Sequence, residues 1–264
     1  MSKLNFKKGF AVGMVHLPPV LTCRYGTYSD IRALIDRAVN DAYILQECGF
    51  DGVMVQNGKD VCRKSESDNF TVAMISEVCG EIRSKVSIPL GINVLKNDVI
   101  TALSIAKITD MQFVRCKVFV GASVSGEGII EGCAERAISY RDEIRANDIE
   151  VWSETYDLSS RPLQRLSFED TIKWCKKMHS DSYIVCGHKH DDTLAYCSAA
   201  RKIVGDAKVI IGGGVNLKNL EQSVRECDGF IVGSAVEKVP FTGPVSPELA
   251  EEFMRHVTAA RQNI

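Results

Sequence analysis

The chain has 264 residues, of which 45% are hydrophobic and 25% are charged, a length and composition typical of a globular domain with a large core. Its formal net charge of -2 gives no electrostatic basis for binding nucleic acid or an anionic membrane. The apolar runs are far shorter than the ~20 residues of a membrane span, and the first apolar strand starts too early for a signal peptide to precede it.

Short β-rich segments alternate with longer amphipathic segments along the whole chain. The predicted strands are residues 10–16, 52–57, 89–94, 112–118, 150–154, 182–186, 208–212 and 229–232. The predicted helices are residues 29–48, 69–84, 98–108, 131–145, 167–178, 192–203, 217–226 and 247–260. Strands that alternate with such helices indicate a parallel sheet, and eight repeats favour closure into a (β/α)8 TIM barrel. The rival is a doubly wound open α/β sheet, whose usual strand number is smaller. We expect one barrel domain over residues 1–264.

The ten cysteines have no regular spacing and form no Cys-x-x-Cys pair. Several fall in apolar strands or near helix ends, which is typical of small buried hydrophobic residues in a reducing compartment. A cytoplasmic protein is therefore expected. Neither a disulfide framework nor a zinc site is expected.

Active sites of such barrels form at the carboxyl ends of the strands. Polar residues or glycines follow most of the predicted strands, and the barrel would bring them to one face. These candidates are His16, Asn57, Asn93, Arg115, Lys117, Glu154, His188, Gly213, Gly214, Gly233 and Ser234.

The loops after the last two strands form the strongest pattern. Gly213 and Gly214 follow the seventh strand, and Gly233 and Ser234 follow the eighth. Glycines let the backbone approach a ligand closely, and these two loops are the usual phosphate site of phosphate-binding barrels. In the alternative interpretation the glycines only permit a tight turn and Asn216 caps the next helix.

The other candidates suit acid–base chemistry and recognition of hydroxyl groups. Glu154 is a candidate general acid or base, and His16 could polarise a carbonyl or transfer a proton. Arg115 and Lys117 share a strand face and could bind an anionic group, and Lys117 could also act as a base or form a Schiff base. A buried ion pair of these cations with Glu154 is the alternative, as is a structural role for His16.

Asparagines and histidines complete the set. Asn57 and Asn93 suit hydrogen bonds to sugar hydroxyls, whereas Asn97 is expected to cap a helix. No cofactor is predicted; His188 and His190 give only a weak indication of a divalent metal site, with Asp191 or Glu154 as a further ligand. The alternative is a polar loop in which Asp192 caps the sixth helix.

Seven stretches resemble the BtpA/SgcQ family, in the family's order along the chain. They are Val12-Gly-Met-Val-His-Leu-Pro-Pro, Ala38-Val-Asn-Asp-Ala, Gly49-Phe-Asp-Gly-Val-Met-Val-Gln-Asn, Gly91-Ile-Asn-Val-Leu-Lys-Asn-Asp, Gln112-Phe-Val-Arg, Gly128-Ile-Ile-Glu-Gly and Asp228-Gly-Phe-Ile-Val-Gly-Ser. The resemblance implies a barrel similar to the ribulose-phosphate-binding superfamily and names no general reaction. It supports functional roles at His16, Asn57, Asp60, Asn93, Asn97, Asp98, Arg115, Gly214, Gly233 and Ser234. Departures from the family pattern include Lys117, where asparagine is common, and the segments after the fifth and sixth strands.

Two functions of different class follow. The first is an enzyme that acts by acid–base chemistry on a phosphorylated sugar or nucleoside-type molecule, as an isomerase, a lyase or a glycosidic-bond hydrolase. In it His16, Glu154, Arg115 and Lys117 are catalytic, and Asn57, Asp60, Asn93, Gly213, Gly214, Gly233 and Ser234 bind substrate. The second is a non-catalytic assembly or stability factor that uses the barrel as a binding scaffold. The expected partner is a phosphorylated small molecule, and a homo-oligomer is compatible with the sequence.

Overall fold

A closed barrel of eight parallel strands forms the centre of the molecule. The structure, a computed structural model, describes residues 4–19, 30–60, 66–156, 158–163, 166–241 and 243–263. The barrel strands are β1 (Phe10–His16), β2 (Gly52–Gln56), β3 (Leu90–Asn93), β4 (Phe113–Cys116), β7 (Glu150–Glu154), β9 (Ser182–Val185), β10 (Lys208–Ile211) and β11 (Gly229–Val232). Their order around the barrel follows the chain, and β11 pairs with β1 to close it. The predicted fold class is confirmed.

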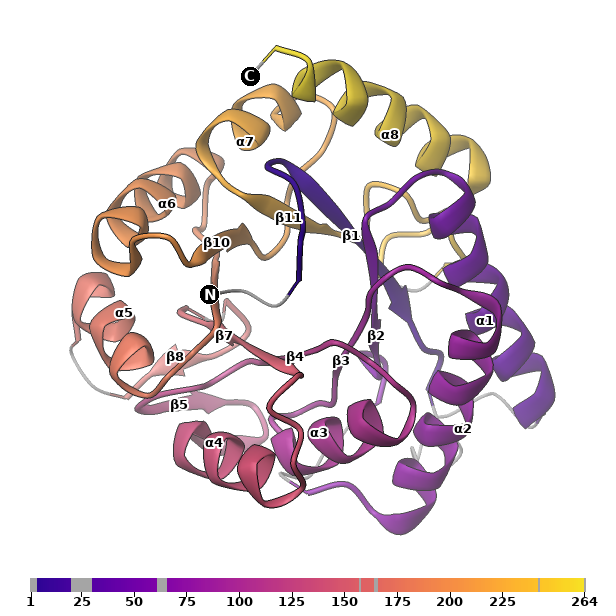
Figure 1. The fold of residues 1–264 in the computed structure, drawn as a ribbon, viewed down its shortest axis with the longest axis horizontal. Helices are drawn as coiled ribbons and strands as arrows, with labels where there is room; N and C mark the ends of the chain where they lie inside the picture. The colour runs from indigo at the N-terminus through magenta and orange to yellow at the C-terminus, as the bar shows by residue number, and fades with distance from the viewer. Residues whose placement is uncertain are drawn as a thin grey trace.

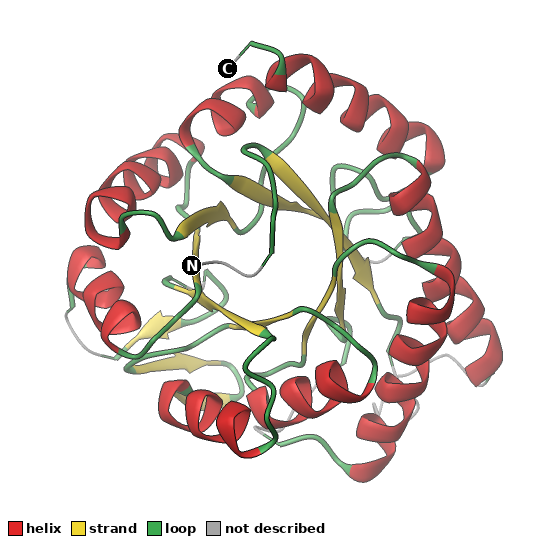
Figure 2. Cartoon of the chain, in the orientation of Figure 1, coloured by secondary structure: helices red, strands yellow, loops and turns green. Residues whose placement is uncertain are grey.

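Helices surround the strands on the outside of the barrel (Figures 1 and 2). They are α1 (Ile31–Glu47), α2 (Asn69–Lys85), α3 (Val99–Ile108), α4 (Ala134–Glu143), α5 (Phe168–Lys177), α6 (His190–Val204), α7 (Leu220–Glu226) and α8 (Pro247–Arg261). Side-chain caps fix several of the starts: Asp68, Ser167 and Ser246 each accept a hydrogen bond from a backbone N–H of the first turn. The largest differences from the predicted bounds, three residues each, are at the starts of α4 and α7.

A small antiparallel sheet, not predicted from the sequence, lies outside the barrel. Its order is β6–β5–β8, from β5 (Ala122–Ser125), β6 (Gly128–Glu131) and β8 (Arg161–Pro162). The first two strands lie between β4 and α4, and the third lies between β7 and α5. The helix expected to begin at residue 131 begins three residues later, because Glu131 still pairs with Ala122 in this sheet. We refer to the three strands as the inserted sheet.

Aromatic side chains fill the barrel and close its amino-terminal end. Phe113 and Trp152 stack with their ring centroids 3.9 Å apart, and Phe6, from the segment before β1, stacks on Phe10 at 4.4 Å. The buried carboxylate of Glu150 accepts hydrogen bonds from the backbone N–H of Leu4 (3.2 Å) and from the indole N–H of Trp152 (2.9 Å). This end is therefore a packed layer, and the polar strand ends lie at the opposite face of the barrel.

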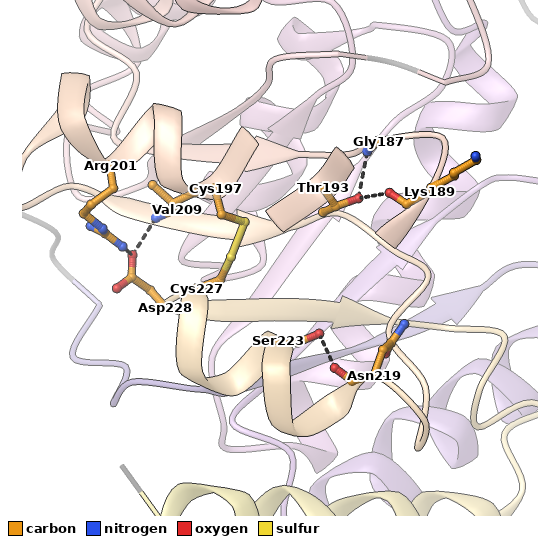
Figure 3. The surroundings of a disulfide bond; sticks show 10 residues. All are labelled: Gly187, Lys189, Thr193, Cys197, Arg201, Val209, Asn219, Ser223, Cys227 and Asp228. Carbon is orange, nitrogen blue, oxygen red and sulfur yellow. Dashed lines mark hydrogen bonds and ion pairs between the residues drawn. A yellow bond between two sulfur atoms is a disulfide. The ribbon is translucent and has the colours of Figure 1, made fainter. Parts of the chain in front are cut away.

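One disulfide bond corrects the expectation that the cysteines are unpaired. Cys197 of α6 is bonded to Cys227, which directly follows α7 (Figure 3). Both residues are buried, and the neighbouring Asp228 forms an ion pair with Arg201 and accepts a hydrogen bond from the backbone N–H of Val209. The two cysteines are 30 residues apart, a spacing that carries no local signal in the sequence. Six other described cysteines are free, and Cys23 and Cys62 lie outside the described residues.

None of the helices in the described part of the chain combines the length and apolar character needed to cross a bilayer.

Candidate functional site

Glu154 holds two cations at the carboxyl ends of β4 and β7. Its Oε2 atom lies 2.9 Å from Nη2 of Arg115 and 3.1 Å from Nζ of Lys117. Arg115 lies in β4 and Lys117 directly follows it, two residues further along the chain, and both side chains meet one carboxylate. All three side chains are largely buried. The sequence named these residues both as catalytic candidates and as a possible ion pair, and the structure contains the ion pair.

Arg115 also faces the loop after β10. A Cβ atom built on Gly212 would lie 3.5 Å from Nη2 of Arg115 and only 2.5 Å from Sγ of Cys186. A side chain at position 212 would therefore collide with Cys186, and glycine allows the backbone to pass close to the guanidinium. Burial, more than the nearby charge of Glu154, raises the pKa of Cys186 to about 12, so its thiol stays protonated near neutral pH.

The loop after β10 is open at its tip. Gly213 and Gly214 have free space where a Cβ would point, and Gly214 has φ +80°, a conformation that other residues rarely adopt. The side-chain amides of Asn216 and Asn219 both donate to the carbonyl of Gly214, at 3.2 and 3.0 Å. Asn219, not the expected Asn216, occupies the N-cap position, because α7 begins three residues later than predicted; its side chain makes no capping hydrogen bond to the helix.

His16, at the end of β1, pairs with a residue that the sequence analysis missed. Its Nδ1 atom lies 2.6 Å from Oε1 of Glu237, which is 3% exposed and follows β11. The other oxygen of Glu237 accepts a hydrogen bond from the backbone N–H of Phe241 (2.5 Å). A Cβ on Gly233 would lie 2.8 Å from the His16 ring, so this glycine makes room for the imidazole. The pair orients His16 and anchors the segment after β11, which contains Ser234.

Amide side chains complete this face of the barrel near β2 and β3. Asn93 donates to the side-chain oxygen of Gln56 (2.8 Å), a residue that the sequence analysis placed inside the strand and did not select. Asn57 donates to Asp60 (3.1 Å) and accepts from the backbone N–H of Leu95 (2.8 Å). Asn57 and Asp60 thus join the loops after β2 and β3, whereas Asn93 and Gln56 point along the inner face of their strands.

The remaining candidates lie at the edges of this group. Asp98, not the expected Asn97, caps α3; Asn97 instead accepts from the backbone N–H groups of Lys117 and Val118, both at 3.1 Å. His188 is exposed, and His190 is the first residue of α6, where its Nε2 atom is buried without a hydrogen-bond partner. Asp192 accepts from the backbone N–H of Lys189 within the capping box of α6, which therefore begins two residues before the expected start. In the part of the chain that the structure describes, no three His, Cys, Asp or Glu residues are grouped closely enough to hold a metal ion.

A buried carboxyl behind the His16–Glu237 pair predicts a pH dependence of stability. Burial is the main cause that raises the pKa of Asp41 to about 6; the charge of Glu237 adds to it, and the Val245 N–H and Arg37 oppose it. The folded state therefore favours the protonated form. The contribution of Asp41 to stability is complete below its unfolded pKa of ~4 and is lost as the pH rises through 6.

Between pH 4.5 and 7.5 the original chain should lose about 2 kcal/mol of its free energy of unfolding as Asp41 ionises. Asp41→Asn cannot ionise at this position and should not show that loss. Urea unfolding at the two pH values measures the difference. Asp36→Asn, on the exposed side of the same helix, is the control and should leave the pH dependence unchanged. Equal pH dependence in Asp41→Asn and the original chain would contradict the prediction.

Comparison with known proteins identifies the family. The family model described as "BtpA family" matches residues 7–259. The chain belongs to the BtpA family. An uncharacterized protein of Pyrococcus furiosus is 33% identical over 259 residues, which cover 97% of both chains. The photosystem I biogenesis protein BtpA of Synechocystis is 30% identical over 235 residues, covering 86% of this chain and 80% of that protein.

Solved structures agree on the architecture of this BtpA family member. A structure described as native KDPGal covers 100% of this chain and 97% of its own, with a TM-score of 0.57 and 15% identity. The N-(5′-phosphoribosyl)anthranilate isomerase of Pyrococcus furiosus covers 95% and 99%, with a TM-score of 0.57 and 15% identity. Tryptophan synthase of Mycobacterium tuberculosis reaches a TM-score of 0.62 at 10% identity, covering 96% of this chain and 92% of its own. At such identities the likeness concerns the fold alone.

Proposed function

We propose that this protein is an enzyme that binds a phosphorylated sugar or nucleoside-type molecule at the carboxyl-terminal face of the barrel and transfers protons on it. The observation that supports this most directly is the position of Arg115, whose guanidinium borders the glycine loop after β10. A cation beside exposed backbone N–H groups suits a phosphate group.

The proposal assigns a role to each group of the site. Gly213, Gly214, Gly233 and Ser234 surround the phosphate. Arg115 and Lys117 stabilise negative charge that develops on the substrate, while Glu154 holds both cations and exchanges a proton. His16, oriented by Glu237, is the second acid–base group. Asn93 and Gln56 bind hydroxyls on the inner face, with Asn57 and Asp60 fixing the adjoining loops. The chemistry is that of an isomerase, a lyase or a glycosidic-bond hydrolase.

A binding test isolates the phosphate loop. We expect ribose 5-phosphate to raise the melting temperature, and ribose to leave it unchanged. Gly214→Asp should abolish the effect, because it puts a carboxylate at the open tip of the loop and repels phosphate. The matched control is Gly205→Asp: Gly205 ends α6, has φ +70° and also has free space for a side chain. Equal stabilisation of both variants by ribose 5-phosphate, or none in the original chain, would contradict the phosphate site.

The second candidate function is a non-catalytic binding scaffold. It is favoured by the name of the Synechocystis relative, photosystem I biogenesis protein, and by the pairing of Glu154 with two cations. Turnover separates the two functions. With a bound sugar phosphate or nucleotide, an isomerase or lyase should exchange carbon-bound hydrogen for deuterium in D2O, and a glycosidic-bond hydrolase should release the base. Proton NMR observes both reactions, and either should be lost in Glu154→Gln. Binding of these molecules with neither exchange nor hydrolysis would favour the scaffold.

We also propose a cytoplasmic location, which the composition suggests. The Cys197–Cys227 bond is unusual for a reducing compartment, so the number of free thiols in protein purified under alkylating conditions tests the proposal.

A further inference from the structure

A side cavity opens beside the ion pairs of Glu154 and is separate from the glycine loops. It has a volume of about 150 Å³ and lies between the ends of β4 and β7, the inserted sheet, and the outer helices α5 and α6. Lys117 and Glu154 line its inner end, and Ser123 of β5 and Pro162 of β8 form part of its wall. The cavity thus begins at the proposed catalytic groups and leads away from the barrel axis.

Aromatic rings line the outer part of this cavity. Phe168 of α5 and Tyr196 of α6 stack with their centroids 4.2 Å apart and their planes inclined by 17°. Tyr156 and the buried Phe119 supply two further rings. Flat aromatic walls favour a flat ligand group, since rings gain most from stacked or edge-to-face contact. A volume of about 150 Å³ suits one ring, whereas a ring together with its ribose and phosphate needs more space.

Polar groups at the inner end would orient such a ring. Lys117 can donate hydrogen bonds and Glu154 can accept them. From Glu154 the ion pair runs to Arg115, and Arg115 borders Gly212 at the start of the proposed phosphate loop. A molecule with a ring at one end and a phosphate at the other can therefore occupy the cavity and the loop while its middle part crosses the catalytic groups.

We propose that the cavity binds the single-ring base of a phosphorylated ligand, of the size of a pyrimidine. The inference rests on the proposed function and narrows its substrate class to ring-bearing phosphates of the nucleotide type. The inserted sheet is then a specificity element, because it supplies the cavity wall that the barrel alone lacks.

Three probes separate the ring cavity from the phosphate loop: uridine 5′-monophosphate, ribose 5-phosphate and uridine, each titrated calorimetrically. We expect uridine 5′-monophosphate to bind about tenfold more tightly than ribose 5-phosphate, in line with the contribution of one stacked base. Thr171→Phe, on the cavity-lining face of α5, should fill the cavity and remove that advantage without changing the binding of ribose 5-phosphate. The control is Thr258→Phe on α8. The hydroxyls of Thr171 and Thr258 each donate a hydrogen bond to the carbonyl four residues earlier, but Thr258 does not line the cavity. If Thr171→Phe fails to fold, Tyr196→Leu removes one stacked ring and should reduce the same advantage.

The outcomes distinguish the two proposals. Equal binding of uridine 5′-monophosphate and ribose 5-phosphate would overturn the ring cavity and leave the phosphate site standing. A tenfold advantage that persists in both Thr171→Phe and Tyr196→Leu would also overturn it. If uridine binds the original chain but not Thr171→Phe, and ribose 5-phosphate binds neither, the result would support the ring cavity and refute the phosphate site. Binding of none of the probes would overturn both.

Discussion

Replacement of Glu154 by glutamine is expected to lower the free energy of unfolding by about 3 kcal/mol. The carboxylate is 4% exposed and is shared by Arg115 and Lys117, so its loss removes the nearby negative charge from two largely buried cations. Glutamine keeps the shape of the side chain, and the effect therefore reports charge rather than a cavity. Unfolding in urea at neutral pH measures it, and the melting temperature should fall by roughly 6 °C or more.

Glu143→Gln is the control for Glu154→Gln, because it makes the same chemical change at an exposed position of α4. It should change the free energy of unfolding by less than about 0.5 kcal/mol. Stability of Glu154→Gln within that same range would show that the ion pairs contribute little to folding.

Reduction of the Cys197–Cys227 bond is expected to have an effect of similar size. Its closed loop of 30 residues restricts the unfolded chain, and a loop of that length stabilises the folded state by about 3.6 kcal/mol. An excess of dithiothreitol should therefore lower the melting temperature by roughly 7–14 °C. The Cys197→Ala/Cys227→Ala variant should begin at the lower temperature and show no response to dithiothreitol.

Cys175→Ala controls for the loss of a buried thiol. Cys175 is free and fully buried on α5, so this variant should remain sensitive to dithiothreitol although its core packing is weakened. A melting temperature of the original chain that does not change on full reduction would contradict the stabilising role of the bond. The loop that the bond closes contains β10 and the glycines that follow it.

The barrel could be predicted because its signals are local. Each strand is a short apolar run beside a turn residue, and each helix repeats its apolar face at helical spacing, so the order of elements is readable one segment at a time. The inserted sheet gave no such signal: β6 is mostly exposed and β8 is only Arg161 and Pro162, so neither has a buried face to produce a pattern.

The candidate site shows the same division. The position of His16, Arg115 and Glu154 at strand ends follows from the fold and could be predicted. The partner of His16 could not be predicted, because Glu237 lies 221 residues away along the chain. The same holds for the disulfide bond, since tertiary packing alone brings Cys227 to Cys197. Gln56 was missed for a simpler reason: the strand was predicted to end one residue later than it does, so Gln56 was read as part of its interior.

The packed layer of Leu4, Phe6 and Glu150 has a consequence for kinetics. It closes the amino-terminal end of the barrel, so the proposed site opens at the opposite face. Substrate and product of the proposed enzyme would bind the same groups from that one face. This predicts competitive inhibition by product.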